Sequence, residues 1–243
     1  DNFALDRGGA LRLTNSSFEI IDGVFTDNVV YTKGGHAYFD GSDGTITSTS
    51  FTLGDAEEED GGALYFYQCG DVSISGGSFS HNTAYEDGGA IGIESVDDFL
   101  LDGVNFTTNT AHKYGGHIGA IGDSSGAITI TGNTLFHDGQ AQKGGAIYLS
   151  AYVSLDIDGA TFTNNDAEND GGAISVMASS LNMLATNATF QSNTAGDNGG
   201  AIANADTTSW SLLDVDFIDN EAAKSGGAVY VYPYWPGLGD LDI

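Results

Sequence analysis

The chain has 243 residues, of which 34 are Asp or Glu and only 6 are Lys or Arg, so its formal net charge at pH 7 is −28. A surface this acidic repels phosphate backbones and anionic headgroups, which argues against binding to nucleic acids or membrane surfaces. No stretch approaches the roughly 20 apolar residues needed to span a bilayer, so direct membrane insertion is not expected either. Cys69 is the only cysteine, so no intrachain disulfide can form.

A Gly-Gly pair recurs along the chain at intervals of 26 to 29 residues, which is the signature of a repeat protein. A small residue or His follows each pair, and apolar and polar residues then alternate, as in residues 63–66 and 146–149. Such alternation predicts a short, half-buried strand after each pair. The first glycines of the pairs are Gly8, Gly34, Gly61, Gly88, Gly115, Gly144, Gly171, Gly199 and Gly226.

Another strand-like run lies further along each repeat, as in residues 72–75 and 155–158, and a Phe-x-x-Asn motif follows it. In two repeats the Phe is kept, but Gly54 and Gly139 replace the Asn. An Ala usually stands two residues further on. Each repeat is therefore expected to contain about three short strands. The complete motifs are Phe25/Asn28, Phe79/Asn82, Phe106/Asn109, Phe162/Asn165, Phe190/Asn193 and Phe217/Asn220.

A single repeat of about 27 residues cannot bury its own apolar face, whereas stacked repeats can. The sequence therefore predicts an all-β fold, a right-handed parallel β-helix of about nine coils that forms one domain over residues 1–243. Stacking would place the Phe residues in an interior column. It would place each Asn in a turn, in a left-handed backbone conformation, with its amide bonded to neighbouring coils. The Gly pairs would supply positive φ or close approach.

Both ends of the sequence fall inside a coil. Asp1-Asn2 matches the end of a Phe-x-x-Asn motif, and no such motif follows Gly226. Uncapped coils expose unpaired strand edges and invite further stacking. We therefore expect a part of a longer array, or a subunit that associates end to end with itself or with neighbouring repeat modules.

Gly-Gly-Ala-[Ile/Leu/Val] combined with Phe-x-x-Asn resembles the repeat of the chlamydial polymorphic outer membrane proteins, and the resemblance covers essentially the whole chain. Related repeats occur in large surface proteins of other bacteria and of some algae and protists. The resemblance implies a β-helical region that is displayed on the cell surface and associated with adhesion. Because a fold does not fix a function, the site must be argued from residues.

An outward column of aromatic residues is the candidate binding surface. Exposed aromatic rings can stack on sugars or pack against a protein, so glycans and a surface receptor are the expected partners. The same column also fits simple β-propensity on a solvated face. Its members are Tyr38, Tyr65, Tyr148 and Tyr230 in the strands after the Gly pairs, Tyr67 and Tyr232 two residues further on, and Trp235 near the C-terminus.

Other residues suggest modification or metal binding. Asn15, Asn105 and Asn187 begin N-glycosylation sequons, which matter in a secretory pathway. Acidic runs such as residues 57–60 precede several Gly pairs and would suit Ca²⁺. Lys or Arg takes that place in several coils, so no ligand set is predicted. His36 and His117 lie three coils apart and are interpreted as ordinary surface or turn histidines.

Enzymatic and ice-binding functions are poorly supported. A polysaccharide lyase needs a base beside calcium-binding carboxylates, and a hydrolase needs carboxylates on neighbouring coils. The six cations are scattered, and Asp97-Asp98 is the one acidic doublet in a plausible arc. Outward Thr residues do not extend into the regular grid that ice binding requires. The sequence favours a non-enzymatic, extracellular structural or adhesive module of a cell surface or filamentous appendage; carbohydrate binding or polysaccharide degradation is the alternative.

Overall fold

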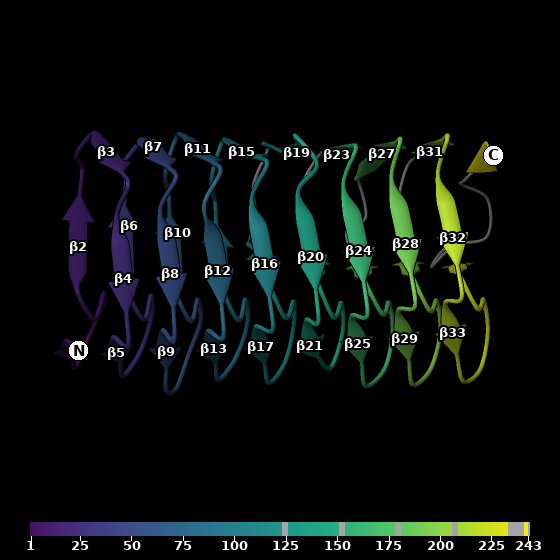
Figure 1. Cartoon of the computed structure of the whole chain (residues 1–243), viewed down its shortest axis with the longest axis horizontal. Helices are drawn as coiled ribbons and strands as arrows, with labels where there is room; N and C mark the ends of the chain where they lie inside the picture. Colours follow the sequence, from purple (N-terminus) through teal and green to yellow (C-terminus); the bar gives the residue numbers. More distant parts are fainter. Residues whose placement is uncertain (123–125, 151–153, 178–180, 206–208, 233–240, 243) are drawn as a thin grey trace.

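The computed structural model describes residues 1–122, 126–150, 154–177, 181–205, 209–232 and 241–242. These residues form an all-β parallel solenoid of four sheets, and each coil contributes one strand to each sheet (Figure 1). Every strand pairs in parallel with its counterpart in the next coil. Eight coils are complete and three strands of a ninth follow. The predicted fold is confirmed, while the right-handed sense stays a prediction.

Sheet 1 follows the Phe-x-x-Asn turn and consists of two-residue strands. The sequence did not predict it, because two residues are too few to show alternation. Its strands are β1 (Phe3–Ala4), β5 (Val29–Val30), β9 (Asp55–Ala56), β13 (Thr83–Ala84), β17 (Thr110–Ala111), β21 (Gln140–Ala141), β25 (Asp166–Ala167), β29 (Thr194–Ala195) and β33 (Glu221–Ala222). Each coil therefore has four strands, and the expected three was wrong.

Sheet 2 follows the Gly pair and contains the predicted alternation. Its strands are β2 (Leu11–Thr14), β6 (Ala37–Asp40), β10 (Leu64–Tyr67), β14 (Ile91–Glu94), β18 (Ile118–Ile121), β22 (Ile147–Leu149), β26 (Ile174–Val176), β30 (Ile202–Ala205) and β34 (Val229–Tyr232).

Sheets 3 and 4 complete the coil. Sheet 3 comprises β3 (Phe18–Ile21), β7 (Gly44–Thr47), β11 (Asp71–Ser75), β15 (Asp98–Asp102), β19 (Ala127–Thr131), β23 (Ser154–Asp158), β27 (Asn182–Thr186), β31 (Ser209–Leu213) and β35 (Leu241–Asp242). Sheet 4 carries the Phe of each motif and comprises β4 (Val24–Thr26), β8 (Ser50–Thr52), β12 (Ser78–Ser80), β16 (Asn105–Thr107), β20 (Leu135–His137), β24 (Thr161–Thr163), β28 (Thr189–Gln191) and β32 (Asp216–Ile218).

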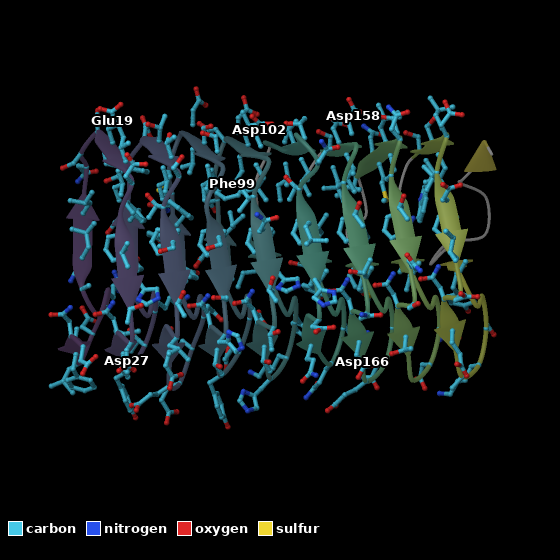
Figure 2. All side chains as sticks on the ribbon, viewed as in Figure 1. Glu19, Asp27, Phe99, Asp102, Asp158 and Asp166 are labelled. Carbon is cyan, nitrogen blue, oxygen red and sulfur yellow. The ribbon has the colours of Figure 1, made fainter. Side chains whose placement is uncertain are left out.

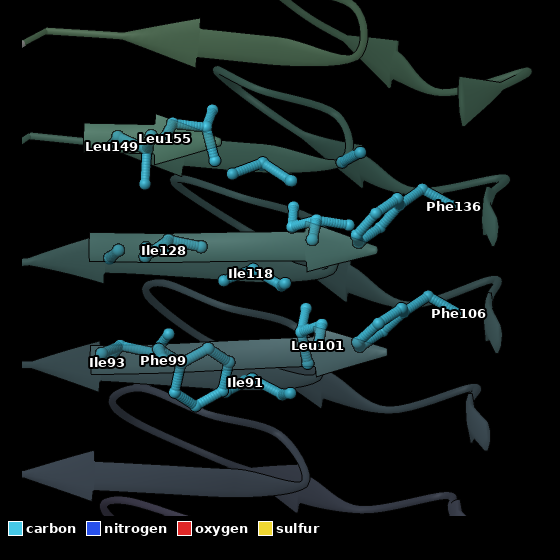
Figure 3. Close-up of a cluster of buried hydrophobic side chains, with 14 of the residues drawn as sticks. Ile91, Ile93, Phe99, Leu101, Phe106, Ile118, Ile128, Phe136, Leu149 and Leu155 are labelled. Carbon is cyan, nitrogen blue, oxygen red and sulfur yellow. The ribbon is translucent and has the colours of Figure 1, made fainter. Parts of the chain in front are cut away.

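The interior is filled by columns of like side chains, which the in-register pairing brings together. Consecutive motif Phe rings lie 4.7 to 5.2 Å apart, with interplanar angles of 4 to 19°. Figure 3 shows Phe106 and Phe136 in this stack, beside aliphatic residues such as Ile118 and Leu101. Burial of each ring contributes about 1.5–3 kcal/mol, so the predicted aromatic column is a main source of stability.

The motif Asn residues form a buried ladder along the axis. The Asn82 Nδ2 atom donates to Asn109 Oδ1 at 2.9 Å in the next coil and to the Phe51 carbonyl at 3.1 Å in the preceding one. The left-handed backbone expected at the Asn lies one residue earlier, at His81 (φ 56°) and Thr108 (φ 53°). The Asn uses both its backbone N–H and its amide to bond the next coil, so the chain bends at the residue before it.

The two glycines of each pair have different roles. Gly88 has a φ of 66°, and a Cβ there would lie 2.2 Å from the Ile91 carbonyl oxygen. A Cβ on Gly89 would lie 2.2 Å from the Gly116 carbonyl oxygen of the next coil. Both distances exclude a side chain. The first glycine thus supplies the positive φ and the second permits the close approach of coils, as the sequence predicts.

Candidate binding surfaces

The tyrosine column predicted as an exposed binding surface is largely buried. Only 1% of Tyr38, 0% of Tyr65 and 8% of Tyr148 is accessible to solvent. Their side chains do leave the outer face of sheet 2, but other side chains cover them. The expectation that these three rings are exposed is therefore wrong, and burial removes the basis for binding by them. Tyr67 and Tyr230 are partly exposed.

The residue before each Gly pair provides this cover. Backbone bridges such as Arg7 to Lys33 align these residues into a column of their own. The Arg7 guanidinium lies 4.8 Å from the centre of the Tyr38 ring in the next coil, and the Lys33 ammonium lies 4.3 Å from that of Tyr65. Cation–π contact thus replaces solvent on these rings. The covering residue comes from the preceding coil, so alternation within one strand cannot reveal it.

Small and large side chains of this outer layer pack against each other. The Tyr114 ring stacks on Tyr148 with their centroids 4.4 Å apart. Where the column has glycine, a neighbour fills the place: a Cβ on Gly92 would lie 2.5 Å from Tyr65 Cδ2, and one on Gly119 would lie 3.0 Å from Asp87 Cβ. The mixture of Tyr and Gly along the column is therefore explained by packing.

A charged cluster around Lys33 closes the outer layer. The Lys33 ammonium lies 2.9 Å from Asp60 Oδ2 and 3.6 Å from Glu94 Oε2, and it donates to the Tyr65 hydroxyl at 2.8 Å. Burial alone would lower the pKa of Lys33, but Asp60, Glu94 and Glu59 together outweigh burial and raise the pKa. Burial and the hydrogen bond to Glu94 raise the pKa of Tyr65. The cluster is internally satisfied and leaves Tyr65 no group to offer a ligand.

His36 and His117 are fully buried in the bend that follows the Gly pair, so they are turn histidines but not surface ones. They stand in the same two coils in which Gly54 and Gly139 replace the motif Asn. A Cβ on Gly54 would lie 2.8 Å from His36 Nε2, and one on Gly139 would lie 2.7 Å from His117 Nε2. Each imidazole therefore occupies the space that an Asn side chain fills in other coils.

The two imidazoles also take over the hydrogen bonding of the missing Asn. His36 Nδ1 accepts from Asn28 Nδ2 at 2.8 Å, and His117 Nδ1 accepts from Asn109 Nδ2 at 3.0 Å. Because Nδ1 faces an amide donor, it must be unprotonated, so each ring is neutral with its proton on Nε2. Burial lowers the pKa of His36 to about 4 and that of His117 to about 3. Both rings maintain the fold and cannot ligate a shared metal.

The remaining predicted residues lie at the periphery. The sequon residues Asn15, Asn105 and Asn187 are exposed, so their glycosylation stays a prediction. Asn187 Nδ2 donates to Asp158 Oδ1 at 2.8 Å. Trp235 lies outside the described residues, as does the side chain of Tyr232.

All six Lys and Arg side chains form ion pairs, which explains how the acidic turns stack. Lys143 lies 3.4 Å from Asp170, and Lys224 lies 2.5 Å from Asp197. Within the described ranges, no three His, Cys, Asp or Glu side chains are grouped as metal ligands. A calcium site therefore gains no support from the geometry. The described part of the chain also contains no helix long and apolar enough to cross a membrane.

A groove on the outer face of sheet 1 is the surface that the sequence did not indicate. It encloses about 440 Å³ and runs over β13, β17, β21 and β25. Figure 2 shows side chains projecting outward along this sheet, with Asp166 labelled among them. Its walls include Tyr85, His112, Gln140 and Gln142. These residues lie roughly one repeat apart, so no local motif unites them. Only a comparison of equivalent positions in successive repeats would have brought them together.

Comparison with known families identifies the repeat. The Chlamydia polymorphic membrane protein repeat matches four segments of the chain, residues 76–94, 159–176, 187–205 and 214–232. Each segment begins in the turn before a strand of sheet 4, continues through the Gly pair and ends with the next strand of sheet 2. No curated protein and no solved structure matches the chain.

Proposed function

The chain carries Chlamydia polymorphic membrane protein repeats, which are repeats of outer-membrane and surface proteins of Chlamydia, and from this premise we propose that it is a non-enzymatic, extracellular structural or adhesive module. It would belong to a cell surface or to a filamentous appendage. The observation that carries the proposal is the continuity of the four sheets through all described coils. Such a solenoid is a rod, and a rod can display a binding face at a distance from the cell.

The dimensions and charges agree with this role. Nine levels of strands spaced ~4.8 Å apart give a rod roughly 40 Å long, which more coils would lengthen without a new core. Packed hydrophobic side chains fill its interior, and the buried motif Asn residues are engaged in hydrogen bonds between coils. The scattered cations are engaged in ion pairs, so no described lysine or arginine stands beside Asp97-Asp98 as a lyase base would.

Surface location is tested by labelling cells of the source organism with antibodies against the purified chain. We expect immunogold on intact cells, with a cytoplasmic protein as the negative control. Label that requires permeabilisation would contradict the proposal. Beads coated with the chain test the adhesive role: they should bind target cells or each other more than beads coated with an acidic protein of similar charge.

End-to-end association is the finer form of this proposal. The outermost coils present unpaired strand edges, and residues of the interior columns are only partly buried there, including Phe25 and Phe217. A Cβ on Gly200 would lie 2.1 Å from the Gly227 carbonyl oxygen of the next coil, whereas among the described residues the nearest atom to a Cβ on Gly227 is the Asn220 carbonyl oxygen at 3.6 Å. Gly227→Ala should therefore leave the chain folded but block a further coil from stacking in the same geometry.

Analytical ultracentrifugation over a range of concentrations tests this association. The unmodified chain should form species that lengthen with concentration, and the Gly227→Ala chain should remain monomeric. Equal association of both chains, or a monomer of the unmodified chain throughout, would count against end-to-end stacking. The surface role would be unaffected by either result.

A further inference from the structure

The groove beside β13, β17, β21 and β25 encloses about 440 Å³ and is lined by residues of four successive coils. It crosses four coils, and three steps of ~4.8 Å give it a length of roughly 14 Å. A volume of about 440 Å³ lies in the range of small-ligand sites, and the groove is open along its length. Its shape suits a short chain molecule better than a compact metabolite.

We infer that this groove binds a neutral oligosaccharide. One wall is an aromatic platform. Tyr85 is 49% exposed, and its ring centroid lies 5.4 Å from that of His112 at an interplanar angle of 37°. The His112 Nδ1 atom lies 3.2 Å from the Ala84 carbonyl oxygen, to which it donates, and this contact fixes the imidazole against the coil. An exposed ring next to a fixed second ring can pack against the apolar face of a pyranose.

The opposite part of the groove supplies hydrogen-bonding groups. Gln140 and Gln142 are exposed, and each amide offers both donors and an acceptor, which matches the mixed character of sugar hydroxyls. Asp166 adds a carboxylate acceptor at the far end and is held by the Thr194 hydroxyl. Aromatic packing on one side and amides with a carboxylate on the other is the combination that a pyranose, with its apolar face and hydroxyl rim, requires.

The charge of the groove selects against acidic sugars. Lys113 is its one lysine, and its ammonium lies 2.5 Å from Glu86 Oε1, which neutralises it. The other fixed charges of the lining are the carboxylates Asp166 and Glu168, and no ion pair engages either within the described residues. Uronate, sialylated or sulfated glycans would therefore be repelled, in keeping with a net charge of −28.

This inference rests on the proposed surface role, which would place the groove among external glycans. Its test uses the purified chain on an array that displays neutral oligosaccharides (chito-, cello-, manno- and galacto-oligosaccharides) and sialylated and uronate-containing ones. We expect signal on a subset of the neutral glycans. Calorimetry with the best of these, repeated with Tyr85→Ala, should show binding weakened about tenfold or more.

Tyr31→Ala is the matched control, because Tyr31 occupies the same position of the repeat two coils away, is 46% exposed and does not line the groove. It should bind as the unmodified chain does. Gln140→Ala, checked for an unchanged melting temperature, should also weaken binding. Absence of binding to every neutral glycan, preference for acidic glycans, or equal loss in Tyr31→Ala and Tyr85→Ala would overturn the inference. Cell-surface labelling would be unaffected, so the two proposals fail separately.

Discussion

Asp87 carries a charge that opposes the fold at neutral pH. Burial raises its pKa from 3.8 to about 7, and the Asp60 and Glu86 carboxylates add to the rise. Asp87 Oδ1 is buried and has no hydrogen-bond partner. The folded-state pKa thus lies above the unfolded-state value. The unfolded state therefore releases this proton first, and Asp87 reduces stability increasingly as the pH rises from about 4 to 7.

Replacing Asp87 with Asn should therefore stabilise the protein in a pH-dependent way. The Asn mimics the protonated carboxyl, so the gain should be about 2–4 kcal/mol at pH 8 and clearly smaller at pH 5. Thermal denaturation of both chains at the two pH values measures it. Asp71→Asn, which changes an exposed carboxylate in β11, is the control for the loss of one negative charge. A gain equal at both pH values would show that burial of the charge is not the cause.

In two coils, His follows the Gly pair and Gly ends the Phe-x-x-Asn motif (His36 with Gly54, His117 with Gly139), where the other coils have Ala and Asn. We expect His36→Ala to cost about 2–4 kcal/mol, because it opens a cavity beside Gly54 and leaves Asn28 Nδ2 without its acceptor. Gly54→Asn alone should lower the stability more than His36→Ala does, since the new side chain clashes with the His36 imidazole. The double variant should be more stable than Gly54→Asn, and melting temperatures of the four chains form the cycle. If the stability losses of the two single variants simply added in the double variant, His36 and Gly54 would not replace Ala and Asn as a coupled pair.

At the scale of the element, the second glycine of each pair determines how closely two coils approach. Gly89→Ala places a Cβ 2.2 Å from the Gly116 carbonyl oxygen, so one coil must move and the change should cost more than about 2 kcal/mol. Gly227→Ala occupies the equivalent position, meets no atom of the described ranges closer than 3.6 Å and should be nearly neutral. Denaturation midpoints of the two variants give the comparison. A similar loss in both would mean that backbone freedom, rather than contact between coils, requires the glycine.

The elements could be predicted where a pattern repeats within one strand or one turn. Sheet 2, the Phe column and the Gly pairs were found in this way, because alternation and like-on-like stacking are visible in the sequence. Sheet 1 was missed because its strands are two residues long. The burial of Tyr65 was missed because its cover, Lys33, comes from another coil. The groove beside Tyr85 was missed for the same reason, since its walls meet only after stacking.

At the scale of the whole molecule, coils contact only their neighbours, so a complete coil should be removable. Deletion of residues 83–109 joins Asn82 to Thr110 and brings Asp60 opposite Gly119, which Asp87 otherwise contacts. It removes Glu94 but leaves Lys33 with Tyr65 and Asp60. This chain should fold and melt cooperatively at a moderately lower temperature. Deletion of residues 55–82 removes a coil of nearly the same length but deprives Lys33 of Tyr65 and of its Asp60 partner. The melting temperature of this second chain should be lower than that of the chain lacking residues 83–109. A higher melting temperature would contradict the importance of the outer layer.

The outer layer also has a consequence for how the chain finds its fold. The interior columns are so uniform that a coil could pair with the wrong neighbour and still place Phe51 on Phe106. The outer contacts do not tolerate that mistake: Lys33 would face Gly92 instead of Tyr65, and Tyr114 would face Ser175 instead of Tyr148. The interior drives collapse, whereas the tyrosines under their covering side chains make misaligned pairings less stable. The outer layer therefore favours the correct order of coils during folding.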